Sequence, residues 1–417
     1  MIYLIFEVLL LLILTKLKYK KFFTLGSMFG LAWSVPLIVD LIAADYMGIL
    51  KPSNTIIWYV GLGILAYNLV YFVMVHKNEA YFKFEFSDYG DKSIIYLLLI
   101  MSAIILLPSL INNYQNIANG NFGAIRTYYV QQIQTAGGIK NYVTMILPYS
   151  IINCAMMISA VDVINNGKYK LFITTFLLML MYTGAYGGRE QYKVIIIYFF
   201  ILIVANRGKK EKNTGIVYVM IVMIVGLIIS ITMQRGGSDS SFLKMFAEYF
   251  VSQYSMLQYI INHPDVYGLF NPNCYGLLSL GPIWTLPGIV LKMLIHDISL
   301  PADMIGEFTQ QYVNISTTSR YLGMNAHTTS IYYFLFDFGK WGVIFGPMIF
   351  GFLSAILQKY KKFGGKYRGL FELFLINVIL NSSIVYDLCQ PDVAIMIPVF
   401  VLMSLRIKVR FVRRNKR

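Results

Sequence analysis

The sequence predicts an all-α polytopic membrane protein of about eleven transmembrane helices, folded as a single membrane domain over residues 1–417. The composition is the first reason, because 57% of the residues are apolar, only 13% are charged and the mean hydropathy is +0.62. A soluble domain carries roughly 25% charged residues. The second reason is a series of long apolar runs, since a helix needs about 20 apolar residues to cross a bilayer. A soluble enzyme, a disordered chain and a fibrous repeat are thereby excluded.

The apolar runs place the expected spans near 2–15, 22–44, 54–75, 93–111, 142–161, 171–186, 192–205, 215–233, 341–358, 370–386 and 392–406. The total is about eleven, within a range of about ten to twelve, because run boundaries are soft. Two connections are long, namely 112–140 and 234–340, and a basic tail follows at 406–417. The second connection is too long to be a passive link, so we expect it to contain interfacial or re-entrant helices.

Lysine and arginine residues divide unequally between the two sets of connections. The set formed by 16–21, 76–92, 162–170, 207–212, 359–368 and 406–417 holds 25 of the 35 basic residues. The other set is longer and holds only 10. Because cationic loops resist translocation, the first set is predicted to be cytoplasmic, with the N-terminus outside and the C-terminus inside. No basic residue precedes the first apolar run, which predicts a reversed anchor and not a cleaved signal peptide.

The sequence predicts no metal and no nucleotide cofactor. The four histidines and three cysteines form no HExxH, no CxxC and no compact cluster, and neither a P-loop nor a dinucleotide glycine pattern is present. The net charge of +15 follows from the cytoplasmic bias and the tail, so we expect membrane lipids and no nucleic acid as partners. Cys274 and Cys389 fall on the predicted outer side, where a disulfide is chemically permitted, and the sequence leaves their pairing open.

Arg189 and Glu190 lie in a polar turn between two apolar runs of roughly 16 and 14 residues, which are short for a bilayer. The turn is therefore expected below the outer surface. Gly187 and Gly188 precede a helix N-terminus, where free N–H groups favour an anion, and Arg189 adds a fork of donors suited to phosphate. The alternative is that Arg189 reaches lipid headgroups or pairs with Glu190.

The two long outer connections supply further candidates. The first, 112–140, is rich in Asn, Gln and Tyr, the side chains that sugar recognition uses, and it contains Arg126; a plain solvated loop has a similar composition. The second begins near Arg235 and contains an expected helix over 241–262, whose polar residues recur every three to four positions. We expect that helix on the membrane surface with a narrow wet stripe, followed by a re-entrant or interfacial piece over 281–296.

Later in the second connection, Arg320, Asn325 and His327 precede the apolar run Ile331–Phe336, and Asp337-Phe-Gly339-Lys-Trp-Gly342 follows it. Together with Gly187-Gly-Arg189-Glu190, these motifs resemble those of the bacterial O-antigen polymerases, or oligosaccharide repeat-unit polymerases. The predicted architecture is similar over nearly the whole chain. The related O-antigen ligases share this plan.

The resemblance implies a metal-independent glycosyltransferase that joins polyprenyl-diphosphate-linked glycan units on the outer face of the bacterial inner membrane. His327 would act as base, with Arg189 and Arg320 at the catalytic centre. Arg126, Arg235, Glu190, Asn325 and Asp337 would contact substrate, with Glu190 or Asp337 orienting the base. The implied partners are the lipid-linked oligosaccharide and a chain-length regulator. Structural alternatives are an interfacial histidine for His327 and a cap or turn residue for Asp337.

Three other functions remain open. A glycan ligase differs only in its acceptor. A flippase or transporter of lipid-linked sugars would place charged and broken-helix residues at the bilayer midplane. A membrane glycosyltransferase that needs an acidic pair and a metal in its first outer loop is less well matched, because only Asp45 lies there. The sequence names neither the sugar nor the linkage.

Overall fold

The computed structural model describes residues 1–77, 79–80, 92–135, 139–188, 190–205, 215, 217–218, 220–226, 242–270, 273–295, 300–309, 312–319, 321–324, 328–360 and 368–404. Its helices are α1 (Ile2–Tyr19), α2 (Leu25–Met47), α3 (Asn54–Met74), α4 (Lys92–Asn112), α5 (Tyr114–Ala118), α6 (Phe122–Thr135), α7 (Ile139–Asn141), α8 (Leu147–Asn166), α9 (Lys170–Tyr186), α10 (Glu190–Ala205), α12 (Phe242–Asn262), α13 (Gly281–Leu294), α14 (Pro301–Thr309), α15 (Thr329–Phe338), α16 (Gly342–Tyr360), α17 (Arg368–Asn381) and α18 (Pro391–Ser404). A π-helical turn (Tyr142–Ile146) leads into α8, and 3-10 turns occupy Gly339–Trp341 and Asp387–Cys389. The short strands β1 (Val313–Asn314) and β2 (Gly323–Met324) pair antiparallel.

The prediction of a helical fold is confirmed, and the lengths and composition of the helices fit a polytopic membrane protein. Five helical stretches are long and apolar enough to cross a bilayer, namely Leu25–Met47, Asn54–Met74, Lys92–Asn112, Tyr142–Ile164 and Thr329–Lys359, and five shorter apolar helices accompany them among the described residues. Ten of the expected spans coincide with described helices. Most of the eleventh, at 215–233, lies outside the described residues, although 220–226 are helical.

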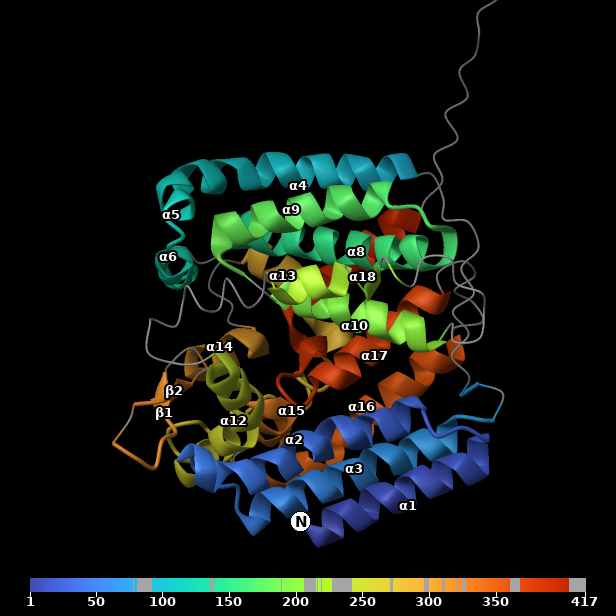
Figure 1. The fold of residues 1–417 in the computed structure, drawn as a ribbon. Coiled ribbons are helices and arrows are strands. Elements are labelled where there is room, and N and C mark those ends of the chain that lie inside the picture. Colours follow the sequence, from blue (N-terminus) through green and yellow to red (C-terminus); the bar gives the residue numbers. More distant parts are fainter. Residues whose placement is uncertain are drawn as a thin grey trace, which may run out of the picture.

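The helices form two groups joined through the C-terminal helices (Figure 1). In one group α3 packs along α16, α2 packs on α1 and α12, and α15 packs on α16. In the other group α4, α8 and α9 pack on one another. Helix α17 contacts both α2 and α8 and so connects the groups, and α18 packs on α8 of the second group.

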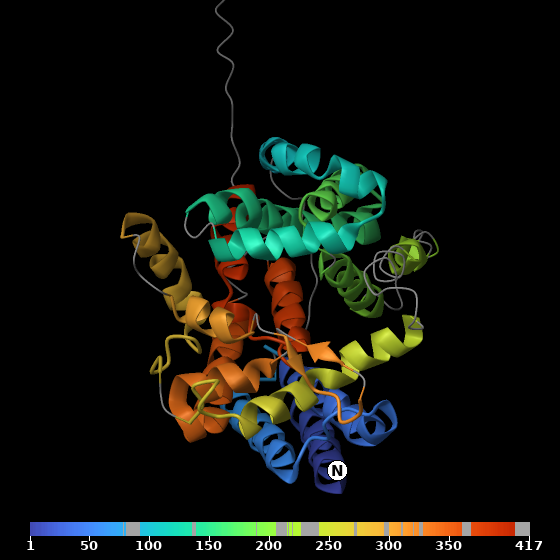
Figure 2. The ribbon, with the colours of Figure 1, turned by 90° about the vertical axis from the view of Figure 1, so that its left-hand side faces the viewer.

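Contacts between their ends show that α1 to α4, α8 and α9 run in the directions that the predicted spans require. At one end, Tyr19 donates to the Val75 carbonyl at 3.2 Å and Lys92 pairs with Asp162 at 2.5 Å. At the other end, Asn113 donates to the Ala185 carbonyl at 2.9 Å. That second end also carries α5, α6, α14, β1 and β2, and we call it the loop end; it is on the left in Figure 1 and faces the viewer in Figure 2.

Helix α12 agrees with the predicted bounds to within one residue. The prediction of a wet polar stripe is wrong for Ser252 and Ser255, which are buried, whereas Asn262 is exposed. Ser255 donates through its backbone N–H and its hydroxyl to Asp40 of α2, both at 3.0 Å. Gln258 accepts from the Ser53 N–H at 2.7 Å. Ser255 and Gln258 therefore face protein partners. Polar residues that recur every three to four positions predict one polar face of a helix, but they do not tell whether that face contacts protein or water.

Glycines let the closest helix pairs touch. A Cβ on Gly351 of α16 would lie 2.6 Å from the Tyr67 carbonyl oxygen of α3, and one on Gly346 would lie 2.1 Å from the ring of Phe334 in α15. Without a large hydrophobic drive between helices in lipid, such small residues allow the contact that holds them together.

We predict that Gly351→Ala destabilises the protein by about 1–3 kcal/mol, because the added methyl group forces α3 and α16 apart. Thermal unfolding in detergent measures the effect. Gly226→Ala is the matched control, since no atom of the described residues lies within 4 Å of a Cβ there. Equal melting temperatures for Gly351→Ala and the native protein would contradict the close approach.

Candidate functional site

The turn between α17 and α18, residues 382–390, lies within the length of the bundle, and we call it the tip. The Trp33 indole N–H donates to the Ser382 hydroxyl at 2.9 Å. Trp33 is eight residues into α2, about 12 Å from the end of this helix that lies opposite the loop end, and the helix is about 34 Å long. The expected span over 370–386 is too long at its end, since α17 stops at Asn381. Apolar residues after the break extended the predicted span.

The tip carries polar groups that are buried inside the helix bundle. Asn381 donates its side-chain N–H groups to both carboxylate oxygens of Asp387, each at 2.9 Å, and Asp387 is only 9% exposed. Gln390 donates to the Tyr333 hydroxyl at 3.3 Å. Ionisable residues at membrane depth are expensive and usually functional. Sequence reasoning missed Asp387, although Asn381, Ser382, Ser383 and Asp387 interrupt an apolar run and signal the break.

Helix α15 begins directly against the tip. The Thr329 N–H donates to the Ile384 carbonyl at 2.9 Å, and the Ser330 N–H donates to the Ser382 carbonyl at 3.0 Å. Thr329 has a φ of 59°, in the left-handed region that a β-branched residue rarely adopts. The predicted residues Asn325 and His327 lie immediately before this contact, outside the described residues. In the sequence, only Thr328 separates His327 from Thr329, the first residue that bonds to the tip.

Asp337 holds the loop 273–281 in place. Its carboxylate accepts the backbone N–H groups of Gly276 at 2.7 Å, Ser279 at 2.9 Å and Leu278 at 3.5 Å, and its side chain is fully buried. Both oxygens are used by the loop. The geometry thus supports the turn-residue alternative for Asp337 and gives no support to a substrate contact.

The loop 273–281 and α13 in turn cover the tip. Tyr386 donates to the Ser279 carbonyl at 2.8 Å, and Thr285 of α13 donates to the Cys389 carbonyl at 3.3 Å. A Cβ on Gly281 would lie 2.6 Å from the Leu388 carbonyl oxygen. The long connection therefore reaches the tip with its backbone, and the Asp337 carboxylate fixes its position there.

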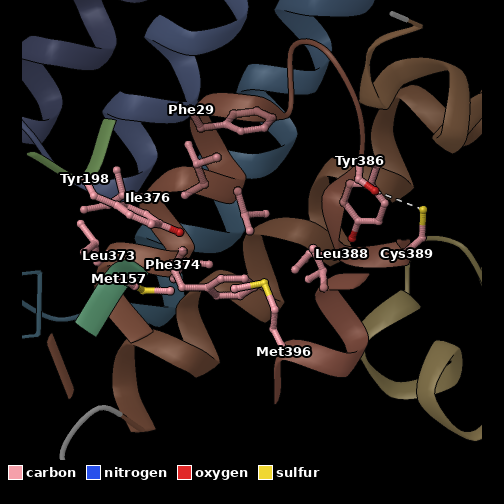
Figure 3. Packing of buried hydrophobic residues seen from close by; sticks show 14 of the residues in the cluster. Phe29, Met157, Tyr198, Leu373, Phe374, Ile376, Tyr386, Leu388, Cys389 and Met396 are labelled. Atoms are coloured by element: carbon pink, nitrogen blue, oxygen red, sulfur yellow. Dashed lines mark hydrogen bonds between the residues drawn. The ribbon is translucent and has the colours of Figure 1, made fainter. Parts of the chain in front are cut away.

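A buried apolar cluster packs around the tip (Figure 3). Tyr386 and Leu388 of the tip point into it with Phe374 of α17 and Met396 of α18. Tyr386 also meets Phe350 edge-on, with ring centroids 5.4 Å apart. The tip thus packs against a buried apolar cluster, which holds the side chains of the tip in place.

The three cysteines are free and buried. Burial, helped by the nearby Asp337 carboxylate, raises the pKa of the Cys274 thiol to about 12. Burial also raises the pKa of Cys389 well above its ordinary value. The pairing that the sequence left open is absent, and the thiols are held in their unreactive neutral form.

The structure describes few of the other predicted site residues. Arg126 lies on α6 with an exposed side chain. Arg189, Arg235 and Arg320 lie outside the described residues, and Glu190 begins α10 with an undescribed side chain. Before Arg189, α9 ends at Gly187 with a φ of 66°, in the left-handed region that favours glycine.

Among the described residues, no group of three His, Cys, Asp or Glu side chains could hold a metal ion. Comparison of the chain with protein-family models, with curated proteins and with solved structures finds no match. The site is therefore defined by its own geometry, namely a buried polar tip covered by the loop 273–281 and contacted by the start of α15.

We predict that Asp337→Asn lowers the free energy of unfolding by about 1–3 kcal/mol, because the amide presents donors to backbone N–H groups that need acceptors. Thermal unfolding measures the loss. Asp45→Asn should be close to neutral, since Asp45 is exposed and pairs with the exposed Lys51. A melting temperature unchanged by Asp337→Asn would show that the carboxylate does not hold the loop.

We also predict that all three thiols resist N-ethylmaleimide at neutral pH, because the reagent needs an accessible thiolate. Mass spectrometry of the native protein should find no adduct, whereas protein denatured in guanidinium should carry three. Rapid labelling of Cys274 in the native protein would contradict its burial.

Proposed function

We propose that this protein polymerises polyprenyl-diphosphate-linked oligosaccharide repeat units into a surface polysaccharide of the O-antigen or capsule type. The reaction would take place on the outer face of the bacterial inner membrane, by glycosyl transfer without a metal. The proposal rests first on the motifs around Arg189, His327 and Gly339. Its supporting observation in the structure is that the elements flanking the candidate residues belong to the loop end or to the tip beneath it.

Contacts between elements carry that observation. Helix α6, with Arg126, packs on α9, and α9 ends directly before Arg189. The residues after His327 bond to the tip, which the loop 273–281 covers. Lysines mark the opposite end, where Lys92 pairs with Asp162. With the positive-inside rule, this arrangement favours the proposed orientation: about eleven spans, the N-terminus and loop end outside, and the C-terminus in the cytoplasm.

The chemistry suits such a site. A polyprenyl-diphosphate donor carries its own leaving group, so no nucleotide is required. When the bond between the anomeric carbon and the phosphate oxygen breaks, negative charge grows on the diphosphate. A guanidinium about 4 Å from that charge contributes roughly 4 kcal/mol at an effective dielectric near 20, before desolvation is subtracted. Arg189 and Arg320 are proposed for this role, with Arg126 and Arg235 as further contacts.

His327 is proposed as the base that takes the proton of the acceptor hydroxyl, because an imidazole accepts protons near neutrality. Asn325 would contact the sugar. Glu190 stays a candidate orienting carboxylate. Asp387 replaces Asp337 as the second carboxylate candidate, since Asp387 is on the tip that α15 touches directly after His327.

We predict that Arg189→Ala, Arg320→Ala and His327→Ala each abolish long glycan chains, because each removes a charge or a base from the transition state. The measurement is the length distribution of surface glycan on gels, in a strain lacking the native gene, with membrane insertion verified by immunoblot. Arg368→Ala, at the start of α17 on the opposite end, is the control and should leave chain lengths unchanged. Native chain lengths for all three variants would refute the proposed site.

A flippase of lipid-linked oligosaccharide is the second candidate, because the helix break at the tip lies at membrane depth, as in transporters. Loss of a flippase leaves lipid-linked units on the cytoplasmic side. Loss of a polymerase leaves single units attached to the lipid core, and loss of a ligase leaves none there. A chain-length regulator remains the proposed protein partner of the polymerase.

A further inference from the structure

Glu7 is a buried carboxylate on a helix whose other face belongs in lipid. Apart from Lys16 and Lys18 in its last turn, the exposed residues of α1 are apolar, including Ile2, Phe6 and Leu17, each more than 60% exposed. A face of this kind is stable only against lipid or another apolar surface. Glu7 lies on the opposite face and is 6% exposed. It is five residues into α1, about 8 Å from the start of the helix.

The Glu7 side chain packs on α3 where a glycine makes room for it. A Cβ on Gly61 would lie 2.9 Å from Glu7 Oε2 and 3.0 Å from Cε1 of Tyr3. Tyr3 packs on Trp58 of α3, with ring centroids 5.0 Å apart. Both oxygens of Glu7 are buried and have no hydrogen-bond partner in the part of the chain that the structure describes, which includes all of residues 1–77.

No cation on the neighbouring helices can neutralise this carboxylate. Helix α1 packs on α2 and α3, and α3 has no Asp, Glu, Lys or Arg. Helix α2 has only Asp40, which accepts from Ser255, and Asp45, which pairs with Lys51.

On α1 itself, the nearest cationic side chain is that of Lys16, nine residues further on and thus about 14 Å along the axis; the Met1 ammonium group is six residues before Glu7, about 9 Å along the axis. Tyr3 is the titratable side chain that lies beside Glu7. A phenol supplies no positive charge, so an ionised Glu7 would be an uncompensated buried anion.

Burying an isolated carboxylate in a medium of low dielectric is so costly that the group takes up a proton instead. We propose that Glu7 is a proton-binding site within the membrane, held as a neutral carboxylic acid in the gap at Gly61. Once ionised, the Glu7 carboxylate is more stable in water than in the gap at Gly61, so ionisation weakens the packing of α1 on α3. This inference does not depend on the proposed glycosyltransferase activity.

A hydrophobic carbodiimide tests the protonation state, because it reaches membrane carboxyl groups through lipid. In the reaction the carboxylic proton moves to one nitrogen of the carbodiimide, and the carboxyl oxygen bonds to the central carbon. The acyl group then moves from oxygen to nitrogen and leaves a stable N-acylurea. No oxidant, reductant or other reactant is consumed, and an ionised carboxylate lacks the proton that begins the sequence.

The experiment treats the full-length protein in liposomes with N,N′-dicyclohexylcarbodiimide and maps adducts by mass spectrometry. At about pH 6 we expect at least about tenfold more adduct on Glu7 than on Asp45, whose side chain is 71% exposed and ion-paired. Glu7→Gln should remove the adduct from its peptide. Equal labelling of Glu7 and Asp45, or no Glu7 adduct in liposomes where protein unfolded in SDS gives one, would overturn the proposal.

The thermal stability of Glu7→Leu and Glu7→Gln gives a second measurement that needs no reagent. A neutral, unpartnered carboxyl group contributes no ion pair, so Glu7→Leu should melt at the native temperature or above it. If the melting temperature of the native protein falls as the pH rises, that fall should be absent from Glu7→Leu. A large drop in melting temperature for both variants at every pH would mean that Glu7 is ionised and paired, and would refute the proposal.

Discussion

Backbone groups at membrane depth need partners, and the tip is where this constraint acts most strongly. Between α17 and α18 the helical hydrogen bonds stop, which frees the carbonyl groups of Ser382 and Ile384 inside the bundle. The first residues of α15 donate to both carbonyls. In lipid an unpaired peptide group costs several kcal/mol, so this pairing is a condition for the break to exist. The position of α15, and through Asp337 that of the loop 273–281, follows from it.

The sequence predicts most of the helices correctly, because a run of apolar residues and a bilayer thickness are nearly sufficient to define a span. Prediction from the sequence fails where apolar or polar residues contact other parts of the protein and not lipid or water. The end of α17 is one case, since Ile384 and Val385 look like part of a span and instead belong to the tip. The polar residues of α12 are another, because Ser255 and Gln258 have partners on α2 and before α3 that are about 200 residues away in sequence.

The candidate site is less predictable than the fold for a related reason. Asp337 and Asp387 both stand near polar or glycine residues, and only the structure distinguishes them. The first is enclosed by the backbone of a loop, and the second is held by one amide at the tip. Asp40 and Glu7 were not predicted at all, because a single acidic residue in an apolar run changes its mean hydropathy little. Their environments differ greatly: Asp40 has the donors of Ser255, and Glu7 has none in the described chain.

The bonds between α2, α15 and the tip connect residues that the ribosome makes far apart in time. The contact of Trp33 with Ser382 and that of Thr329 with Ile384 both require the tip. Neither contact can form until almost the whole polypeptide has been synthesised. The first helices must therefore remain in the bilayer with an incomplete interior during biogenesis. Insertion of the last two helices completes the protein, and a nascent chain that ends before residue 382 lacks the segment that the loop 273–281 packs against.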